Sequence, residues 1–501
     1  MSMKQDMGHS PPRPSPRRSS APLAPVREPA HIPRSEAPRP SGSPMQNTER
    51  MSDPAISRSH VFYRRLARRL PRIVRAEGCY LYDDAGRRYL DACGGAFTVN
   101  AGHGVAEIAD AASEQARTLG YVNGTAFTHD PVEELAAEIA RLSPGGLDLV
   151  YPLGSGSEAV EAALKLARQY WVEAGRGGKR KVLSLAPSYH GNTLLALSAS
   201  ARPHYSAFFE DWMVEVPHVP APYAYRCACR GTPPHCAACS GAAVEAAILK
   251  AGPDTVAAFI AEPIGGSSTG ASVPIPAYWR RVREICDRHQ VLLVADEVLT
   301  GAGRTGTWSA LEPYGVTPDI MTLGKGLAGG YVPLSAVVTT RTIGDVIAGG
   351  SGALAHAQTF SHHPVLCAVG VATLRYLRER RLVERCAEMG GVLHRRLEDL
   401  RELPLVGDVR GRGLLAGIEF VADRGTREPL PRSAAFAETF TLAARDAGLV
   451  VWPNIGHADG RSGDLVMLAP PFVVTEDQID EMVELFARAL RNAAERVGAT
   501  R

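Results

Sequence analysis

The chain has 501 residues, of which 45% are hydrophobic, and its 55 Lys and Arg nearly balance its 53 Asp and Glu, leaving a net charge of +2. A chain of this length can bury a large core and is expected to form more than one folded unit. Because the charges nearly cancel, nucleic acid and anionic membranes are not expected as partners. No apolar stretch approaches the roughly 18 to 20 residues that span a bilayer, so no membrane association is expected.

Residues 1–50 differ in composition from the rest of the chain. Proline recurs there among Ser and Arg, with few large apolar residues. Such a segment cannot bury enough surface to offset its ordering entropy, so we predict a disordered tail. It has no apolar core of a secretory signal, which favours a cytoplasmic, reducing location. Two origins stay open: a genuine tail, or an upstream start codon with true translation from Met45 or Met51.

Two local patterns follow the tail. Residues 78–91 predict a β-hairpin whose turn is Asp83–Gly86. Further on, the glycine turn Gly154–Ala159 follows an apolar run and precedes a stretch with helical periodicity. Its backbone N–H groups, together with the helix N-terminus, suit a phosphate dianion. The turn also fits a loose dinucleotide-binding pattern, but the next apolar run, 181–185, lacks the acid that would bind a ribose and leads instead to Tyr189, an aromatic ring suited to stacking.

Three apolar runs, 255–260, 291–295 and 320–323, are each followed by a charged residue. Each run is typical of a buried parallel strand, and their spacing is near that of one strand–crossover–strand unit, about 30 residues. Helical periodicity between the first two runs predicts a helix there. Since ligands bind outside the carboxyl ends of such strands, we expect Glu262, Asp296 and Lys325 to meet at one edge of a sheet.

Lys325 and Asp296 suggest a chemistry for this edge. Most lysines are solvated surface charges, but Lys325 stands between two glycines, which let a ligand approach an amine that forms a Schiff base. A carboxylate such as Asp296 keeps a pyridine nitrogen protonated, which makes the ring an electron sink. The alternative for Asp296 is an ordinary helix cap after a strand.

Together these residues resemble the class III (ω-) aminotransferases, a family of fold-type I pyridoxal-phosphate enzymes. The resemblance runs from about residue 61 to about residue 494, and its markers are the glycine turn at 154–159, the segments 189–191, 261–263 and 295–298, Lys325 in its glycine frame, and the segment 358–364. It implies an α/β fold with a large domain built on a mostly parallel sheet and a smaller α/β domain. We predict residues 51–105 to belong with the small domain, 106–365 to form the large cofactor-binding domain, and 366–501 to form the C-terminal small domain.

The resemblance also implies roles for individual residues. Lys325 would hold pyridoxal 5′-phosphate as a Schiff base and move the proton, while Asp296 would bind the pyridine nitrogen. Val298, expected on the same strand and face as Asp296, would pack on one side of the ring. The remaining cofactor-site residues are Tyr189 and His190, Gly156 and Ser157 for the phosphate, Glu262 to orient Asp296, and Thr359 from the partner subunit of a homodimer with shared active sites.

The implied function is transfer of an amino group from an ω-amino or primary amine donor to a keto acid such as pyruvate or 2-oxoglutarate. The alternatives left open are an aminomutase, epimerase or decarboxylase of the same fold. On the substrate side, the resemblance points to Phe97, for which a plain core position is the alternative. It also points to Arg461 as the arginine that pairs with a carboxylate, although Leu465 replaces the family's usual histidine and Arg412 competes for the role.

Four of the nine cysteines cluster, at Cys227, Cys229, Cys236 and Cys239. Four thiolates with one C-x-x-C half could hold zinc, but the C-x-C spacing of the other half is poor. The resemblance also points away from a required metal, since it implies a variable loop with scattered cysteines at this position. The sequence-based prediction is therefore that the enzyme has no metal.

Overall fold

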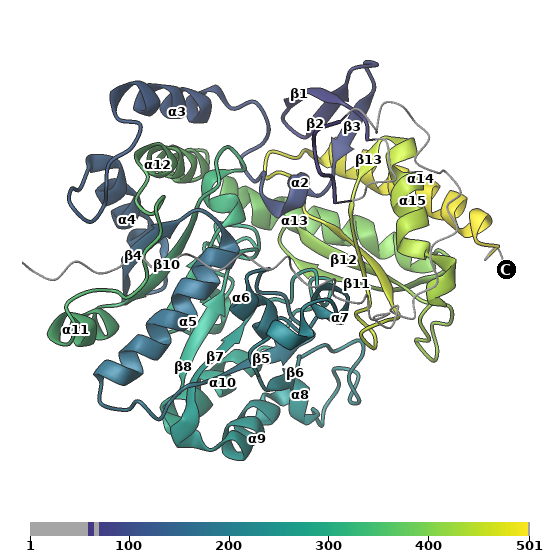
Figure 1. The fold of residues 1–501 in the computed structure, drawn as a ribbon. Helices are drawn as coiled ribbons and strands as arrows, with labels where there is room; N and C mark the ends of the chain where they lie inside the picture. Colours follow the sequence, from purple (N-terminus) through teal and green to yellow (C-terminus); the bar gives the residue numbers. More distant parts are fainter. Residues whose placement is uncertain (1–58, 65–69, 499–501) are drawn as a thin grey trace, which may run out of the picture. The chain divides into compact units, whose positions relative to one another are not determined.

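The computed structural model describes residues 59–64 and 70–498 (Figure 1), so the predicted disordered tail lies outside the described part. The chain divides into a unit ending at Leu70 and a unit from Pro71 onward. All the helices and strands described below belong to the second unit. None of the described helices is both long enough and apolar enough to cross a membrane.

A seven-stranded sheet carries the residues of interest (Figure 1). Its strands are, in spatial order, β4 (Leu147–Leu153), β10 (Ser335–Thr340), β9 (Ile320–Leu323), β8 (Leu292–Asp296), β7 (Val256–Ala261), β5 (Lys181–Ala186) and β6 (His218–Pro220). From β9 to β6 all neighbours are parallel, and β10 is antiparallel to both of its neighbours. The predicted mostly parallel sheet is confirmed.

The continuous apolar runs arise because helices cover both faces of this sheet. All of β7 is buried. Ala258 and Ile260 pack in the cluster that includes α5 (Gly156–Glu173), whereas Phe259 and Ala261 pack with α9 (Ala242–Ala251) and α10 (Tyr278–His289). Helix α10 is the predicted crossover helix. Between β8 and β9 the connection is instead made of turns and a short 3₁₀ helix, η3 (Glu312–Tyr314).

Two four-stranded sheets hold the other named strands of the described residues. One has the order β1 (Ile73–Glu77), β2 (Tyr80–Asp83), β3 (Arg88–Asp91), β13 (Leu449–Val450); the other has β11 (Val406–Arg412), β12 (Leu415–Phe420), β15 (Asp464–Leu468), β14 (Trp452–Ile455). The β2–β3 pair is the predicted hairpin, closed where the Gly86 N–H donates to the Asp83 carbonyl at 3.0 Å. The parallel β3–β13 pair joins the N-terminal segment to the C-terminal part. We retain the domain limits 51–105, 106–365 and 366–501 as a proposal.

The other helices surround these sheets (Figure 1). They are α2 (Gly94–Phe97), α3 (Ala106–Thr118), α4 (Asp130–Leu142), α6 (Leu194–Ala199), α7 (Pro203–Ser206), α8 (Ala237–Ser240), α11 (Arg341–Gly349), α12 (Pro364–Glu379), α13 (Leu382–Glu398), α14 (Phe436–Ala447) and α15 (Glu476–Arg496), with 3₁₀ helices η1 (Glu210–Trp212), η2 (Pro253–Thr255), η4 (Lys325–Ala328), η5 (Asp399–Glu402) and η6 (Arg432–Ala434). The amphipathic α15 begins at a capping box in which Thr475 and Gln478 satisfy each other's backbone N–H groups.

A buried charge network joins β11 and β12 to the loop after β6. The Glu419 carboxylate, fully buried in β12, pairs with Arg226 Nη2 at 2.6 Å and Arg410 Nη2 at 2.8 Å. His457 Nε2 lies 3.1 Å from it, and the Tyr223 hydroxyl donates to it. Although burial alone would raise the pKa of Glu419, these cations hold it well below its ordinary value.

We expect Glu419→Gln to destabilise the fold by about 3–5 kcal/mol, because Arg226 loses its buried carboxylate partner and Arg410 keeps only its ion pair with Asp408. The folded-state pKa is depressed, so the stabilisation is present above the unfolded pKa of about 4.3 and is lost as pH falls toward the folded value. Urea unfolding followed by circular dichroism measures the change. Glu134→Gln is the matched control: its ion pair with Arg375 is half exposed on both sides, and its loss should cost at most about 1 kcal/mol. Equal losses of unfolding free energy in the two variants would contradict the stabilising role of the buried Glu419 network.

Candidate active site

Four adjacent parallel strands bring the predicted residues to one edge of the large sheet. Glu262 directly follows β7, Asp296 is the last residue of β8, and Lys325 begins η4 just after β9. The segment with Tyr189 and His190 follows β5, the next strand along. The expected meeting of the two acids with the lysine at the carboxyl ends of the strands is therefore observed.

Lys325 sits on a strained turn that its neighbours enforce. Its φ of +42° lies in the left-handed region that non-glycine residues rarely adopt. A Cβ at Gly326 would come within 2.6 Å of Asn100 Nδ2, which donates to the Gly326 carbonyl at 3.0 Å. Burial lowers the pKa of the Lys325 amine, while Asp296 and Glu262 act in the opposite direction. The amine is thus closer to its neutral, nucleophilic form than a surface lysine is.

Asp296 is fixed by three hydrogen bonds from neighbouring groups. His190 Nδ1–H donates to Oδ2 at 2.7 Å, and Oδ1 accepts from the Thr322 hydroxyl and the Val298 N–H, both at 3.1 Å. The carboxylate is 4% exposed, and His190 Nε2 has no hydrogen-bond partner among the residues that the structure describes. A buried, oriented carboxylate is suited to pairing with a protonated ring nitrogen.

The expectation that Val298 continues strand β8 is wrong. The strand ends at Asp296, whose side chain accepts from the Val298 N–H and turns the chain. Glu297 points into the interior, where Ser309 and Thr300 each donate to it at 2.6 Å. Val298 nevertheless lies beside the site, since a Cβ at Gly156 would meet its side chain at 2.7 Å and one at Gly324 would meet it at 3.1 Å.

The glycine turn opens helix α5 with the geometry of an anion site. Ser155 caps the helix, accepting from the Glu158 N–H at 3.3 Å, so the helix begins at Gly156. The Ser157 hydroxyl donates to Asn192 Oδ1 at 3.0 Å and accepts from the Asn192 N–H at 3.1 Å. The N-terminal N–H groups and the helix dipole of an 18-residue helix suit a phosphate.

Glu262 contacts the aromatic segment rather than Asp296. Its carboxylate accepts from the Tyr189 N–H at 3.3 Å, the Gly266 N–H at 2.9 Å and the Ser268 hydroxyl at 3.1 Å. Burial raises the pKa of Glu262, and Asp296 adds to that rise. The ring of Tyr189 is half-buried and lies 5.7 Å from the ring of Tyr205. Asp296 receives its orienting hydrogen bond from His190.

The other predicted residues lie around this centre. Thr359 is exposed, and its carbonyl accepts from the Tyr121 hydroxyl at 2.9 Å. Phe97 is 3% exposed and packs on Trp452 with ring centroids 5.3 Å apart, so its ring forms part of an apolar cluster. Arg461 is exposed in the β14–β15 loop. Arg412 lies over the ring of Tyr314 at 5.2 Å.

One buried arginine beside the site was missed by the sequence analysis. Arg202 is 2% exposed, and burial lowers the pKa of its guanidinium, while Tyr205 and Glu262 act in the opposite direction. Its Nη2 donates to Asn454 and, at 3.2 Å, to His204, whose pKa burial and Arg202 lower to about 4. Within the described part of the chain, Nε and Nη1 have no hydrogen-bond partner. No local pattern marks Arg202, because Asn454 and Glu262, which place it beside the site, come from distant segments.

The fold, and the residues at this edge of the large sheet, are those of the pyridoxal-phosphate-dependent transaminases of fold type I. The structure is similar to an (S)-enantioselective ω-transaminase from Thermomicrobium roseum, with a TM-score of 0.81 and 35% identity over 87% of this chain and 97% of that one. It is also similar to the Pseudomonas jessenii ω-transaminase in complex with PMP, with a TM-score of 0.80 and 34% identity over 86% and 94% of the two chains.

Residues 63–490 match the family model "Aminotransferase class-III", and the chain belongs to that family. An uncharacterized aminotransferase of Schizosaccharomyces pombe is 38% identical over 88% of this chain and 97% of its own length. The putrescine–pyruvate aminotransferase of Pseudomonas aeruginosa is 36% identical over 88% of this chain and 96% of its own. The protein is therefore a pyridoxal-phosphate-dependent aminotransferase, and the aminomutase, epimerase and decarboxylase alternatives are not favoured.

The residues present fit pyridoxal phosphate. A phosphate matches the helix N-terminus at Gly156, and a protonated pyridine nitrogen matches the buried carboxylate of Asp296. The glycines at 156 and 324 leave Val298 room beside a flat ring. When bound, this cofactor supplies an electron sink for the charge left by proton removal.

Proposed function

We propose that this enzyme moves an amino group from an ω-amino or primary amine donor to a keto acid such as pyruvate or 2-oxoglutarate. The main support is the position of the Lys325 amine. It lies at the carboxyl ends of the parallel strands, together with the buried acids Asp296 and Glu262. The P. aeruginosa relative, whose name gives putrescine and pyruvate as substrates, supports the choice of donor and acceptor.

Each residue of the site has a proposed task. Lys325 binds the cofactor aldehyde and carries one proton in each half of the reaction. Asp296, oriented by His190, keeps the ring nitrogen protonated. Gly156 and Ser157 bind the phosphate through the helix N-terminus, and Val298 and Tyr189 pack on the two sides of the ring. Glu262 fixes the backbone of Tyr189 at 3.3 Å, which holds the stacking ring in place.

A second group must recognise the carboxylate of the keto acid. Arg461 is exposed in the loop between β14 and β15, and its planar guanidinium suits the pairing with a carboxylate. Arg202 is the other candidate, because a buried guanidinium with two unused donor nitrogens in the described structure favours an anionic ligand. Phe97, behind the half-buried Trp452, contributes to the apolar wall on the substrate side.

We expect Arg461→Ala to raise KM for the keto acid by roughly 10- to 100-fold, the equivalent of one lost charge-assisted contact, and to change KM for a simple amine little. Steady-state kinetics with each substrate varied in turn measures both constants. Arg375→Ala, at an exposed site on α12, is the control and should change neither. Equal effects on both substrates would remove Arg461 from the role. A selective effect in Arg202→Lys, without one in Arg461→Ala, would transfer the role to Arg202.

The active enzyme is proposed to be a homodimer with shared active sites. Thr359 of the partner subunit is the residue expected to complete the phosphate site. In support, Thr359 is exposed while its neighbour Gln358 donates to Glu158 at 2.9 Å. Two large apolar side chains nearby are exposed as well, Tyr121 at 46% and Phe360 at 55%. A cytoplasmic location is proposed too, because none of the nine cysteines, all in the described part of the chain, forms a disulfide, as a reducing compartment favours.

A panel of amines tested against pyruvate and 2-oxoglutarate identifies the substrates. With an ω-amino donor alone, the purified enzyme should convert its yellow cofactor to the pyridoxamine form, and the keto acid alone should then restore the colour, as a two-step exchange requires. Conversion of the amine to an isomer or to a decarboxylated product without a keto acid would contradict the proposed reaction.

A further inference from the structure

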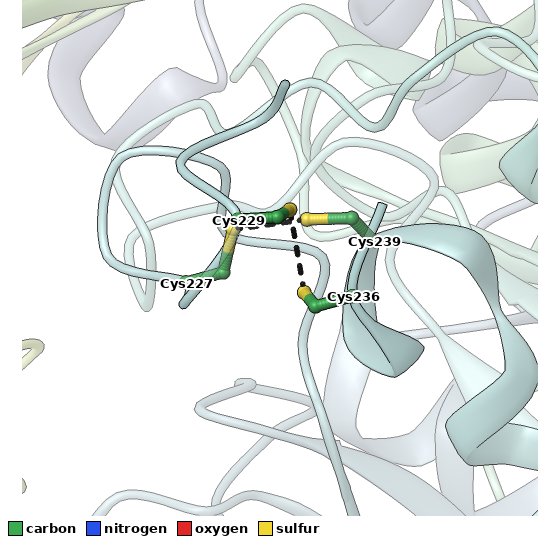
Figure 2. A group of neighbouring side chains, drawn as sticks. All are labelled: Cys227, Cys229, Cys236 and Cys239. Carbon is green, nitrogen blue, oxygen red and sulfur yellow. Dashed lines mark hydrogen bonds between the residues drawn. The ribbon is translucent and has the colours of Figure 1, made fainter. Parts of the chain in front are cut away.

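The loop between β6 and α9 brings four cysteines from two short segments together (Figure 2). Cys227 Sγ lies 3.4 Å from Cys229 Sγ and 3.1 Å from Cys239 Sγ, and Cys229 Sγ lies 3.4 Å from Cys236 Sγ. All four sulfur atoms lie within 4.8 Å of one another. Figure 2 shows the four side chains converging on one point from the two segments.

The sulfur separations, from 3.1 Å up to at most 4.8 Å, bracket the spacing around one tetrahedral ion. With Zn–S bonds of about 2.3 Å, the sulfur atoms of a tetrahedral site stand about 3.8 Å apart. A disulfide bond is much shorter, about 2.05 Å. A single small ion therefore fits the spacing.

The backbone around the sulfur atoms is shaped for such a site. The first pair lies on a turn in which the Arg230 N–H donates to the Cys227 carbonyl at 3.1 Å. Cys236 is the N-cap of α8, which carries Cys239 on its single turn. The Thr232 N–H and hydroxyl donate to the Cys229 carbonyl at 2.9 Å and 2.7 Å, which fixes the turn that carries the first pair.

The loop needs a support of this kind. Of residues 227–240, Cys239 alone is fully buried, so the segment has almost no apolar core of its own. Loops of this length without regular structure are uncommon unless something fixes them. At one end, Tyr223 and Arg226 bind Glu419 of β12. At the other, Gly241 leads into α9 next to Val282 of α10.

We propose that Cys227, Cys229, Cys236 and Cys239 bind one structural zinc ion that fixes this loop against the body of the enzyme. A site with four thiolates is closed, so the ion has no open position for substrate and takes no part in the reaction. Free energy of metal binding then adds to the stability of the folded loop. The proposal is independent of the amino donor and replaces the sequence-based prediction that no metal is present.

Metal analysis of the purified full-length holoenzyme by mass spectrometry tests the proposal. We expect about one zinc per chain, released when a mercurial reagent blocks the thiols. In the variant Cys229→Ser/Cys236→Ser, zinc should fall below about a tenth per chain and the melting temperature should drop, while pyridoxal phosphate stays bound. Cys367→Ala, which removes a buried thiol of α12, is the control and should keep its zinc.

The wild-type measurement decides the question even if the double variant does not fold. A native enzyme without metal, with four rapidly reacting thiols or a disulfide in this loop, would overturn the proposal. Stoichiometric iron in place of zinc would overturn the choice of ion, because tetrahedral four-thiolate sites also suit iron. Zinc retained in the double variant would place the ion elsewhere.

Discussion

Lys325→Ala is expected to lower kcat/KM by at least about 10³-fold. The variant loses the amine that binds the cofactor covalently and the base that carries the proton, and a positioned base alone contributes about 10²–10⁴-fold. The other groups around the cofactor, Asp296, Tyr189 and the start of α5, remain in place, so pyridoxal phosphate should still bind without a covalent link. Single-turnover kinetics and the absorbance of the bound cofactor measure the two effects separately.

The control for this variant is Lys250→Ala, at an exposed position on α9. It should change kcat/KM by no more than about twofold, as most surface substitutions change little. Activity within about tenfold of wild type in Lys325→Ala, with the control unchanged, would show that another group moves the proton.

Asp296→Asn is expected to reduce kcat by roughly 10³- to 10⁴-fold while the fold persists. A carboxylate about 2.8 Å from a charged ring nitrogen, at an effective dielectric constant of about 20, contributes at most about 6 kcal/mol, or about four factors of ten at about 1.36 kcal/mol each. Asparagine keeps the size and can still accept from the Val298 N–H and Thr322 hydroxyl. The change therefore removes mainly the charge, and steady-state kinetics with the full cofactor complement measures it.

Asp287→Asn, on the outer face of α10, is the matched control, since the same substitution there removes a half-exposed ion pair with Arg283. It should leave kcat unchanged. If Asp296→Asn keeps more than about half of the wild-type kcat, the aspartate does not hold the charge of the ring and the proposed role of His190 fails with it.

The residues at the strand ends could be predicted because their signal is local. A parallel strand buried on both faces must be apolar throughout, so a charge within two residues of its end stands out, as Glu262 and Lys325 do. The glycine turn and the hairpin at 80–91 were predicted for the same reason. Strand β10 lies between β4 and β9 and is antiparallel to both. Its own sequence carries no charged residue or turn that would predict this placement.

Contacts between distant segments could not be predicted. The hydrogen bond from His190 to Asp296 joins residues far apart in sequence. It orients the Asp296 carboxylate, which the sequence analysis had expected Glu262 to do. Val298 lies outside strand β8 because the Asp296 side chain accepts a hydrogen bond from the Val298 N–H and ends the strand. The cysteine spacing argued against a metal site, but the fold of the loop between Cys229 and Cys236 brings the two pairs together.

Borohydride reduction of the native yellow enzyme, followed by digestion and peptide mass spectrometry, tests the central assignment most directly. Reduction converts a Schiff base into a stable bond, so the account predicts a phosphopyridoxyl group on the peptide that contains Lys325 and on no other lysine peptide. A label on a different lysine, such as the buried Lys179, or an unlabelled Lys325 peptide from a fully reduced enzyme, would contradict it.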